Sequence, residues 1–207
     1  MDEALLKQIT LDASSELGLD QFNTLQTFLL KRIKTGESLA LHFPEETESI
    51  DLLLQVLSVF KAPQAFEGSP RVLWITDTVD RARRMAQDLK HLCRRSEIAA
   101  ELADDKGKII EQRNHIFEGA DIIIGNPKRL HELYNQNGIH VNQLKLVIID
   151  QLDSYVKHPP TMQFIRRINE SLPKCQYLFV QQDKQERITN FINELVPFHK
   201  TLDQSSL

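Results

Sequence analysis

The sequence has few cysteines and no long apolar run. Its two cysteines, Cys93 and Cys175, lie far apart and form no Cys-x-x-Cys motif, which argues against a disulfide framework or a zinc site. No apolar run approaches the length of a membrane span, and the first residues lack the charged-then-apolar pattern of a signal peptide. We therefore expect a cytoplasmic protein without a membrane partner, whose cysteines act as buried small apolar residues.

An excess of basic residues is also missing. Lys and Arg number 25 against 29 Asp and Glu, and the formal net charge is −4 at pH 7. This balance argues against nucleic-acid binding by overall charge alone, so any basic surface must be local. A chain of 207 residues can bury one sizeable core but is too short for two large ones. We expect one domain over residues 1–207.

Short apolar runs alternate with segments of helical periodicity. The runs are continuous rather than alternating, which predicts strands covered on both faces, at residues 39–43, 72–75, 98–102, 120–124, 146–149 and 177–180. Helices are expected over residues 21–34, 50–60, 78–93 and 127–133, and in a segment that Asp183 caps. This alternation is typical of an α/β fold in which helices cover both faces of a parallel sheet.

Cations are absent between Glu37 and Phe60, a segment that holds five carboxylates. Its residues 42–49, HFPEETES, join the first expected strand to the next helix, where a nucleotide-binding fold places its phosphate loop. Such a loop needs glycines, a lysine and a hydroxyl, but only the hydroxyl of Ser49 is present and Glu48 stands at the lysine position. Two like charges about 4 Å apart repel by roughly 4 kcal/mol, or about three decades in affinity, so we expect this loop to repel a triphosphate.

Six collinear blocks resemble the first RecA-like domain of DEAD-box RNA helicases over nearly the whole chain. They are residues 17–39 with Gln26, the loop 42–49, residues 72–82 (VLWITDTVDRA), residues 120–130 (ADIIIGNPKRL), residues 146–153 (LVIIDQLD) and residues 175–182 (CQYLFVQQ). In that order they resemble the motifs Q, I, Ia, Ib, II and III of the family. The resemblance implies a three-layer RecA-like sheet of the P-loop NTPase type.

The resemblance also implies a vestigial nucleotide site, formed by Gln26, Glu48, Ser49, Asp150 and Gln151. Asp150 and Ser49 keep oxygen atoms of the kind that binds Mg²⁺. Gln151, however, replaces the glutamate that activates the attacking water in the family, and an amide does not accept that proton near pH 7. The family's second RecA-like domain, which supplies arginines to the phosphate, has no room in this chain. We expect no cofactor and no catalytic residues; as an alternative, Asp150 caps the turn that follows its strand.

RNA contact is expected at the segments similar to motifs Ia and Ib, through Thr78, Arg81, Asn126, Lys128 and Arg129. In the family the Ib turn holds the nucleic-acid backbone, and Lys128 adds a charge where glycine is usual. The structural alternative for the Ib turn is a proline-started helix with a surface arginine. The alternative for the basic run is the solvated face of a helix; its members are Arg81, Arg83, Arg84, Lys90, Arg94 and Arg95.

Three functions remain open. The first is a catalytically inactive helicase-like domain that binds RNA weakly and in a salt-sensitive way, or docks into an RNA-processing assembly. The second is a protein-interaction scaffold, with a homodimer as one form of it, that uses the acidic loop 44–51. The third, ranked last, is residual ATP binding.

Overall fold

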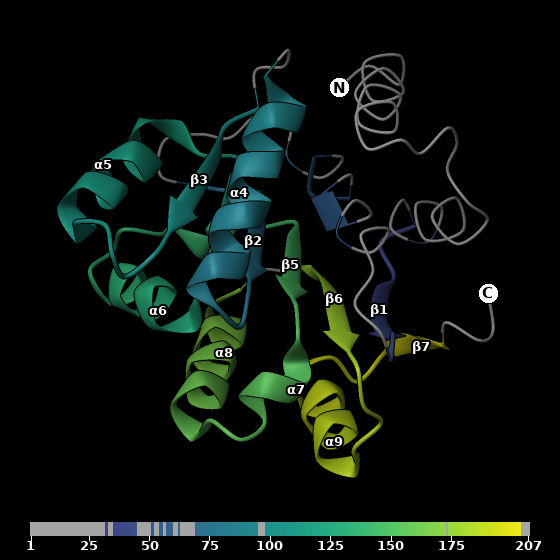
Figure 1. Cartoon of the computed structure of the whole chain (residues 1–207). Helices are drawn as coiled ribbons and strands as arrows, with labels where there is room; N and C mark the ends of the chain where they lie inside the picture. The colour runs from purple at the N-terminus through teal and green to yellow at the C-terminus, as the bar shows by residue number, and fades with distance from the viewer. Residues whose placement is uncertain are drawn as a thin grey trace.

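Seven parallel strands form one sheet in the part of the chain that the structure describes (Figure 1). The computed structural model describes residues 32, 35–44, 51, 54, 55, 57–59, 62, 69–94, 98–172 and 174–203. The strands are β1 (Ser38–His42), β2 (Val72–Ile75), β3 (Ala100–Ala103), β4 (Ile122–Gly125), β5 (Leu146–Ile149), β6 (Gln176–Gln181) and β7 (His199–Asp203). Their order in the sheet is β3-β4-β2-β5-β6-β1-β7.

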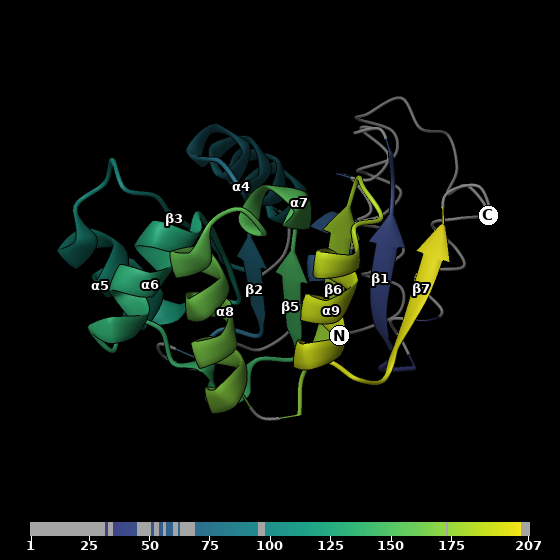
Figure 2. The ribbon, with the colours of Figure 1, turned by 90° about the horizontal axis from the view of Figure 1, so that it is seen from below.

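Helices cover both faces of this sheet. They are α4 (Val79–Cys93), α5 (Ile109–Gly119), α6 (Pro127–Asn135), α7 (Leu152–Tyr155), α8 (Pro159–Ser171) and α9 (Glu186–Leu195), with a 3₁₀ turn η1 at Val141–Gln143. Figure 2 shows α4 on one face and α6, α8 and α9 on the other. The three-layer α/β fold with a parallel sheet is therefore confirmed. None of the described helices is both long and apolar enough to cross a membrane.

Each face of the sheet has its own core, because successive strand residues point to opposite sides. Along β2, Leu73 and Ile75 pack with α6, α8 and α9, whereas Val72 and Trp74 pack with α4. All four residues of β2 are buried, as are all four of β4 and of β5. This burial on both faces is the physical reason for the continuous apolar runs.

The elements that were not predicted are α5, α7, α8, η1 and β7. Helix α5 buries only Ile116, so it has almost no apolar stripe to detect. Helix α8 begins with two prolines, which are tolerated in a first turn but break the pattern. Strand β7 is a polar edge strand that is mostly accessible. Helix α9 is preceded by Gln185 rather than by Asp183, so the predicted cap was wrong.

Two of the predicted helices lie largely or partly outside the described residues. The helix expected over residues 50–60 is helical at residues 51, 54, 55 and 57–59. The helix expected over residues 21–34 lies outside the described residues except at position 32. Among the site predictions, Gln26, Glu48 and Ser49 also lie outside the described residues.

Candidate functional site

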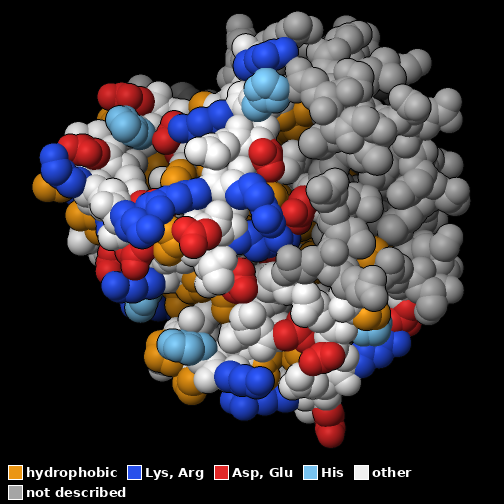
Figure 3. Space-filling view, in the orientation of Figure 1, with side chains coloured by type: hydrophobic (Ala, Val, Ile, Leu, Met, Phe, Trp, Pro, Cys, Tyr) orange, Lys and Arg blue, Asp and Glu red, His pale blue; other side chains and the backbone are white. Residues whose placement is uncertain are grey.

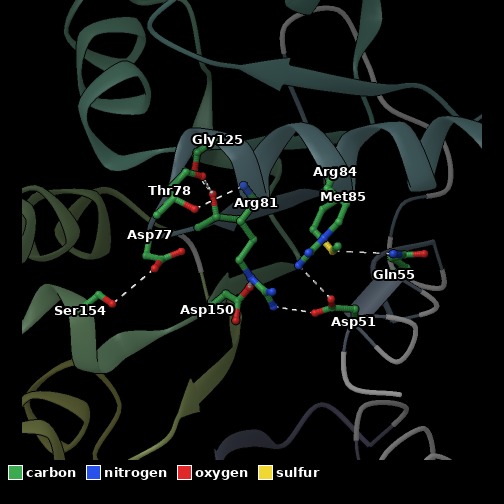
Figure 4. Close-up of polar contacts among 11 residues, drawn as sticks. Asp51, Gln55, Asp77, Thr78, Arg81, Arg84, Met85, Gly125, Asp150 and Ser154 are labelled. Atoms are coloured by element: carbon green, nitrogen blue, oxygen red, sulfur yellow. Dashed lines mark hydrogen bonds and ion pairs between the residues drawn. The ribbon is translucent and has the colours of Figure 1, made fainter. Parts of the chain in front are cut away.

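Arg81 lies in the first turn of α4, and its side chain points into the fold. Nε donates to Asp150 Oδ2 at 2.6 Å, and Nη2 donates to Asp51 Oδ1 at 2.6 Å (Figure 4). The exposed fraction of the side chain is 7% for Arg81, 0% for Asp150 and 19% for Asp51. These three residues form a buried ionic cluster, which we call the Arg81 clamp.

The register of the sheet explains how α4 brings Arg81 to Asp150. Strands β2 and β5 are parallel neighbours with Ile75 opposite Ile149, so the segments that follow them leave the sheet side by side. Thr78 then caps α4, because its hydroxyl accepts a hydrogen bond from the Arg81 N–H at 3.3 Å. The first turn of α4 therefore begins beside Asp150, the residue that follows β5.

The clamp is electrostatically coupled. Burial raises the pKa of Asp150 to about 6, and the charges of Asp51 and Asp77 act in the same direction, whereas Arg81 lowers it. For Arg81, burial lowers the pKa, but the carboxylates of Asp150 and Asp51 raise it above its ordinary value. At pH 7 the clamp thus holds a charged guanidinium against an ionised carboxylate.

The surroundings of Asp150 do not fit a magnesium ion. Arg81 holds its Oδ2, and its Oδ1 is buried without a hydrogen-bond partner in the described part of the chain. Mg²⁺ keeps several waters in a near-octahedral shell, and a side chain with no exposed surface leaves no room for them. Among the described residues, no group of three His, Cys, Asp or Glu side chains could hold a metal. Arg81 is the counter-ion of Asp150 instead.

The turn after β5 has a fixed conformation. Gln151 is buried and left-handed, with φ 55° and ψ 48°, and it precedes α7 without a side-chain capping bond. The Asp150 carboxylate does not cap this turn either, because Oδ2 is bonded to Arg81 and Oδ1 has no hydrogen-bond partner in the described part of the chain, so that interpretation was wrong. Two residues later, the Asp153 carboxylate accepts the N–H of Gln182 at 2.6 Å and of Asp183 at 2.9 Å. These bonds join the turn after β5 to the turn after β6.

The Ib-like turn is also partly internal. Asn126 is 5% exposed and caps α6, since its Oδ1 accepts the N–H of Arg129 at 2.9 Å. Arg129 is 6% exposed, and its Nη2 donates to the Gly107 carbonyl at 3.0 Å. Lys128, by contrast, is 72% exposed, with Nζ 3.7 Å from a carboxylate oxygen of Asp105. The proline-started helix is therefore present, but its arginine lies inside the fold.

The structure thus separates the predicted RNA-contact residues into two groups. Thr78 and Lys128 are accessible, whereas Arg81, Asn126 and Arg129 are buried. Figure 3 shows Lys and Arg side chains gathered over α4, interleaved with Asp and Glu. The solvated-face interpretation was wrong for Arg81. A signal for this was present, because Arg81 shares the helix face of Met85 and Leu89, both of which are buried.

The chain is similar to known RNA helicases. The family model described as DEAD/DEAH box helicase matches residues 50–189. The ATP-dependent RNA helicase RhlB of Vibrio atlanticus (strain LGP32) is 27% identical over 158 residues, which cover 73% of this chain and 36% of the relative. Human ATP-dependent RNA helicase DDX50 is 29% identical over 85 residues, covering 41% of this chain and 11% of the relative. The chain therefore spans about a third or less of these relatives.

Solved helicase structures share the fold. A Saccharomyces cerevisiae Dbp5 variant bound to Nup159, Gle1, IP6 and ADP superposes with a TM-score of 0.80 at 13% identity, covering 94% of this chain and 51% of that chain. A hypothetical ATP-dependent RNA helicase from Sulfolobus tokodaii has a TM-score of 0.79 at 17% identity, covering 95% and 56%. At these identities the likeness establishes the RecA-like fold alone.

Proposed function

The chain belongs to the DEAD/DEAH box helicase family, and from that premise we propose that it is a catalytically inactive member. It acts by binding a macromolecular partner and does not hydrolyse ATP. The observation that carries the proposal is the Arg81 clamp. It places a fixed guanidinium on Asp150, the carboxylate that the family resemblance assigns to the magnesium ion. Gln151 supports the proposal, because an amide in place of the family glutamate is no general base.

Magnesium–nucleotide binding would require Arg81 to leave Asp150. Breaking one partner away from a buried ion pair costs about 3–5 kcal/mol, which corresponds to between about two and four decades in affinity. The acidic loop that includes Glu48 adds charge repulsion against a triphosphate. Both effects oppose the same ligand.

We expect no ATP binding by calorimetry with Mg²⁺ and no phosphate release by the purified chain. The variant Gln151→Glu is expected to remain inactive, because it restores a carboxylate but leaves Arg81 on Asp150. Thermal unfolding of the same samples shows that they are folded. A dissociation constant tighter than about 100 μM, or turnover by either protein, would contradict the proposal.

We propose weak RNA binding at the exposed end of α6, through Lys128 and the nearby Thr78. The relatives are named as RNA helicases, and Lys128 lies at the carboxyl edge of the sheet with most of its surface in solvent. Single-stranded RNA binding of this kind weakens steeply with salt, because each phosphate contact releases counter-ions.

Lys128→Ala is expected to weaken binding of a short single-stranded RNA by about fivefold at about 50 mM salt, a change of about 1 kcal/mol. The slope of log affinity against log salt should fall by about 0.7 for each phosphate that the lysine no longer neutralises. Fluorescence anisotropy measures both quantities. Lys145→Ala is the matched control, since Lys145 is exposed before β5, at the opposite edge of the sheet. Equal weakening in the two variants, or no binding at all, would contradict a local site.

A protein-interaction scaffold is the second candidate function. It is favoured by the burial of Arg81, Asn126 and Arg129, which removes three of the five side chains predicted to contact RNA. The net charge of −4 acts in the same direction. A scaffold of that kind needs a surface with a defined chemistry for its partner.

A further inference from the structure

A small cavity opens between the segments that follow three neighbouring strands, β4, β2 and β5. Its volume is about 270 Å³, and its walls include Asp77, Asp105, Lys128, Tyr155, His158 and Thr161. Ligands of open parallel sheets bind at the carboxyl ends of the strands, which is where this cavity lies. It is too small for a nucleotide but large enough for one long side chain.

The cavity carries a carboxylate that no cation of the described residues neutralises. Asp77 Oδ2 accepts a hydrogen bond from Ser154 Oγ at 3.4 Å, while Oδ1 is buried and has no hydrogen-bond partner in the same part of the chain. Figure 4 shows Asp77 and Ser154 facing each other, joined by this hydrogen bond. Lys128, on the cavity wall, faces Asp105 at 3.7 Å instead. The unmatched charge of the cavity is therefore negative.

Tyr155 is a second, independent unmatched group. Its side chain lines the cavity and is 3% exposed, yet its hydroxyl has no hydrogen-bond partner in the described part of the chain. Burial raises the pKa of this phenol well above its usual value, and the charges of Asp150 and Asp77 add to the effect. Tyr155 thus stays neutral, with an oxygen able to accept and a proton to donate.

These groups favour a ligand that is cationic and rich in donors. A phosphate is disfavoured, because Asp77 repels it and the free oxygen of Asp77 can only accept. A guanidinium offers five N–H donors in a planar fork, pairs with a carboxylate through two bonds, and gives up its water more readily than an ammonium does. The apolar stem of an arginine also suits the walls formed by Val79 and Pro127.

We propose that this cavity binds the guanidinium of an arginine side chain presented by a protein partner, with Asp77 as the paired carboxylate and Tyr155 as a further hydrogen-bond partner. The proposal is independent of ATP hydrolysis. It uses none of the residues of the Arg81 clamp, and binding of an arginine peptide is measured separately from ATP binding, so failure of one proposal can be told from failure of the other.

The test is a titration of the full-length ¹⁵N-labelled chain with a capped Gly-Gly-Arg-Gly-Gly peptide, followed by NMR. Saturable shifts are expected for the amides of Asp77, Asp105 and Ser154, with a dissociation constant in the millimolar range. The peptide with citrulline in place of arginine has the same shape without the charge, and it should cause no saturable shift. Asp77→Asn should weaken binding at least about tenfold, because the guanidinium loses its pair of charge-assisted hydrogen bonds to the carboxylate.

Two further variants separate binding from folding. Tyr155→Phe should weaken binding severalfold while leaving the chain folded, as judged by its spectrum. Asp80→Asn is the matched control: it removes the same charge one turn away, at a side chain that is 92% exposed, and should leave binding unchanged. Equal weakening in Asp77→Asn and Asp80→Asn would overturn the proposal.

The remaining outcomes distinguish other ligands. Free agmatine that binds when the peptide does not would identify a small cation in place of a partner side chain. Equal binding of the citrulline peptide would show that the charge of the guanidinium does not contribute to binding. Shifts of the same amides by single-stranded RNA, with none from the arginine peptide, would assign the cavity to nucleic acid. Each of these results, like the absence of all shifts, overturns the proposal.

Discussion

Arg81→Leu is expected to lower the free energy of unfolding by about 3–5 kcal/mol. The substitution leaves Asp150 with no exposed surface and without its cation, and an uncompensated buried carboxylate is among the most destabilising groups in a protein. Urea denaturation monitored by circular dichroism measures the change. A decrease of this size is a large fraction of the stability of a typical domain, so the melting temperature should fall as well.

Arg84→Leu is the matched control for this prediction. Arg84 lies on the same helix and pairs with the same Asp51, but its Nη2 is 3.4 Å from that carboxylate and its side chain is 57% exposed. An exposed ion pair contributes about 1 kcal/mol or less. Similar decreases in the two variants would mean that the Arg81 clamp is no stronger than a surface pair.

A double variant tests the cause of the decrease. Arg81→Leu combined with Asp150→Leu removes both charges from the interior, and replacing a whole buried pair with apolar groups is often neutral. Most of the stability should therefore return. If the double variant is as unstable as the single one, the decrease comes from packing around α4 and not from the unpaired charge.

The sheet could be predicted from the sequence because its strands are buried on both faces. Continuous apolar runs such as VLWI and LVII are typical of buried parallel strands. In a parallel sheet the turns that follow such strands lie at the same edge. The elements that were missed lack such a signal. Strand β7 is held by pairing with β1 along its whole length, and its own residues, HKTLD, are polar.

The Arg81 clamp could be predicted only in part. The position of Arg81, four residues before Met85 on the apolar face of α4, indicates a buried side chain. Its partners could not be found this way, since Asp51 and Asp150 are separated from it by 30 and 69 residues and meet it only through tertiary packing. Arg81 was assigned to RNA because its segment resembles motif Ia, whereas in the structure a buried ion pair satisfies its charge.

The stability of the chain is expected to fall as the pH rises from about 4 to about 6. Asp150 has a pKa of about 6 in the fold, against an ordinary value of 3.8, so within this window the folded state holds a proton that the unfolded state has released. Proton uptake by the folded state means that its stability is greatest at the acid end of the window. The full contribution is about 3 kcal/mol, at about 1.4 kcal/mol for each pH unit.

Among the other described carboxylates, burial also raises the pKa of Asp88, which therefore contributes in the same direction. Carboxylates with a lowered pKa do not produce this effect. Burial alone would raise the pKa of Asp104, but hydrogen bonds from the Gly107 N–H and from Arg83 lower it. The pKa of Asp203 is lowered by its hydrogen bond with Lys184. The contribution of such groups disappears as the pH falls below about 4, outside the window. Asp150→Asn should therefore reduce the slope of the curve between pH 4 and 6, as measured by urea denaturation at fixed ionic strength, and Asp88 accounts for the slope that remains. An unchanged slope in that variant would show that Asp150 is not the titrating group.

The pH dependence and the destabilisation caused by Arg81→Leu have one origin, and this links the two predictions. Arg81 is what keeps the pKa of Asp150 from rising further, since its charge and its hydrogen bond both lower that pKa. Without Arg81, Asp150 should retain its proton at higher pH, so the falling part of the stability curve should extend beyond pH 6. The destabilisation caused by Arg81→Leu should accordingly be smaller at pH 5, where protonation neutralises Asp150, than at pH 7.5, where the variant must either bury the charge alone or hold a proton that the wild-type fold has released. A destabilisation that is the same at both values would contradict an ionised Asp150 in the folded chain.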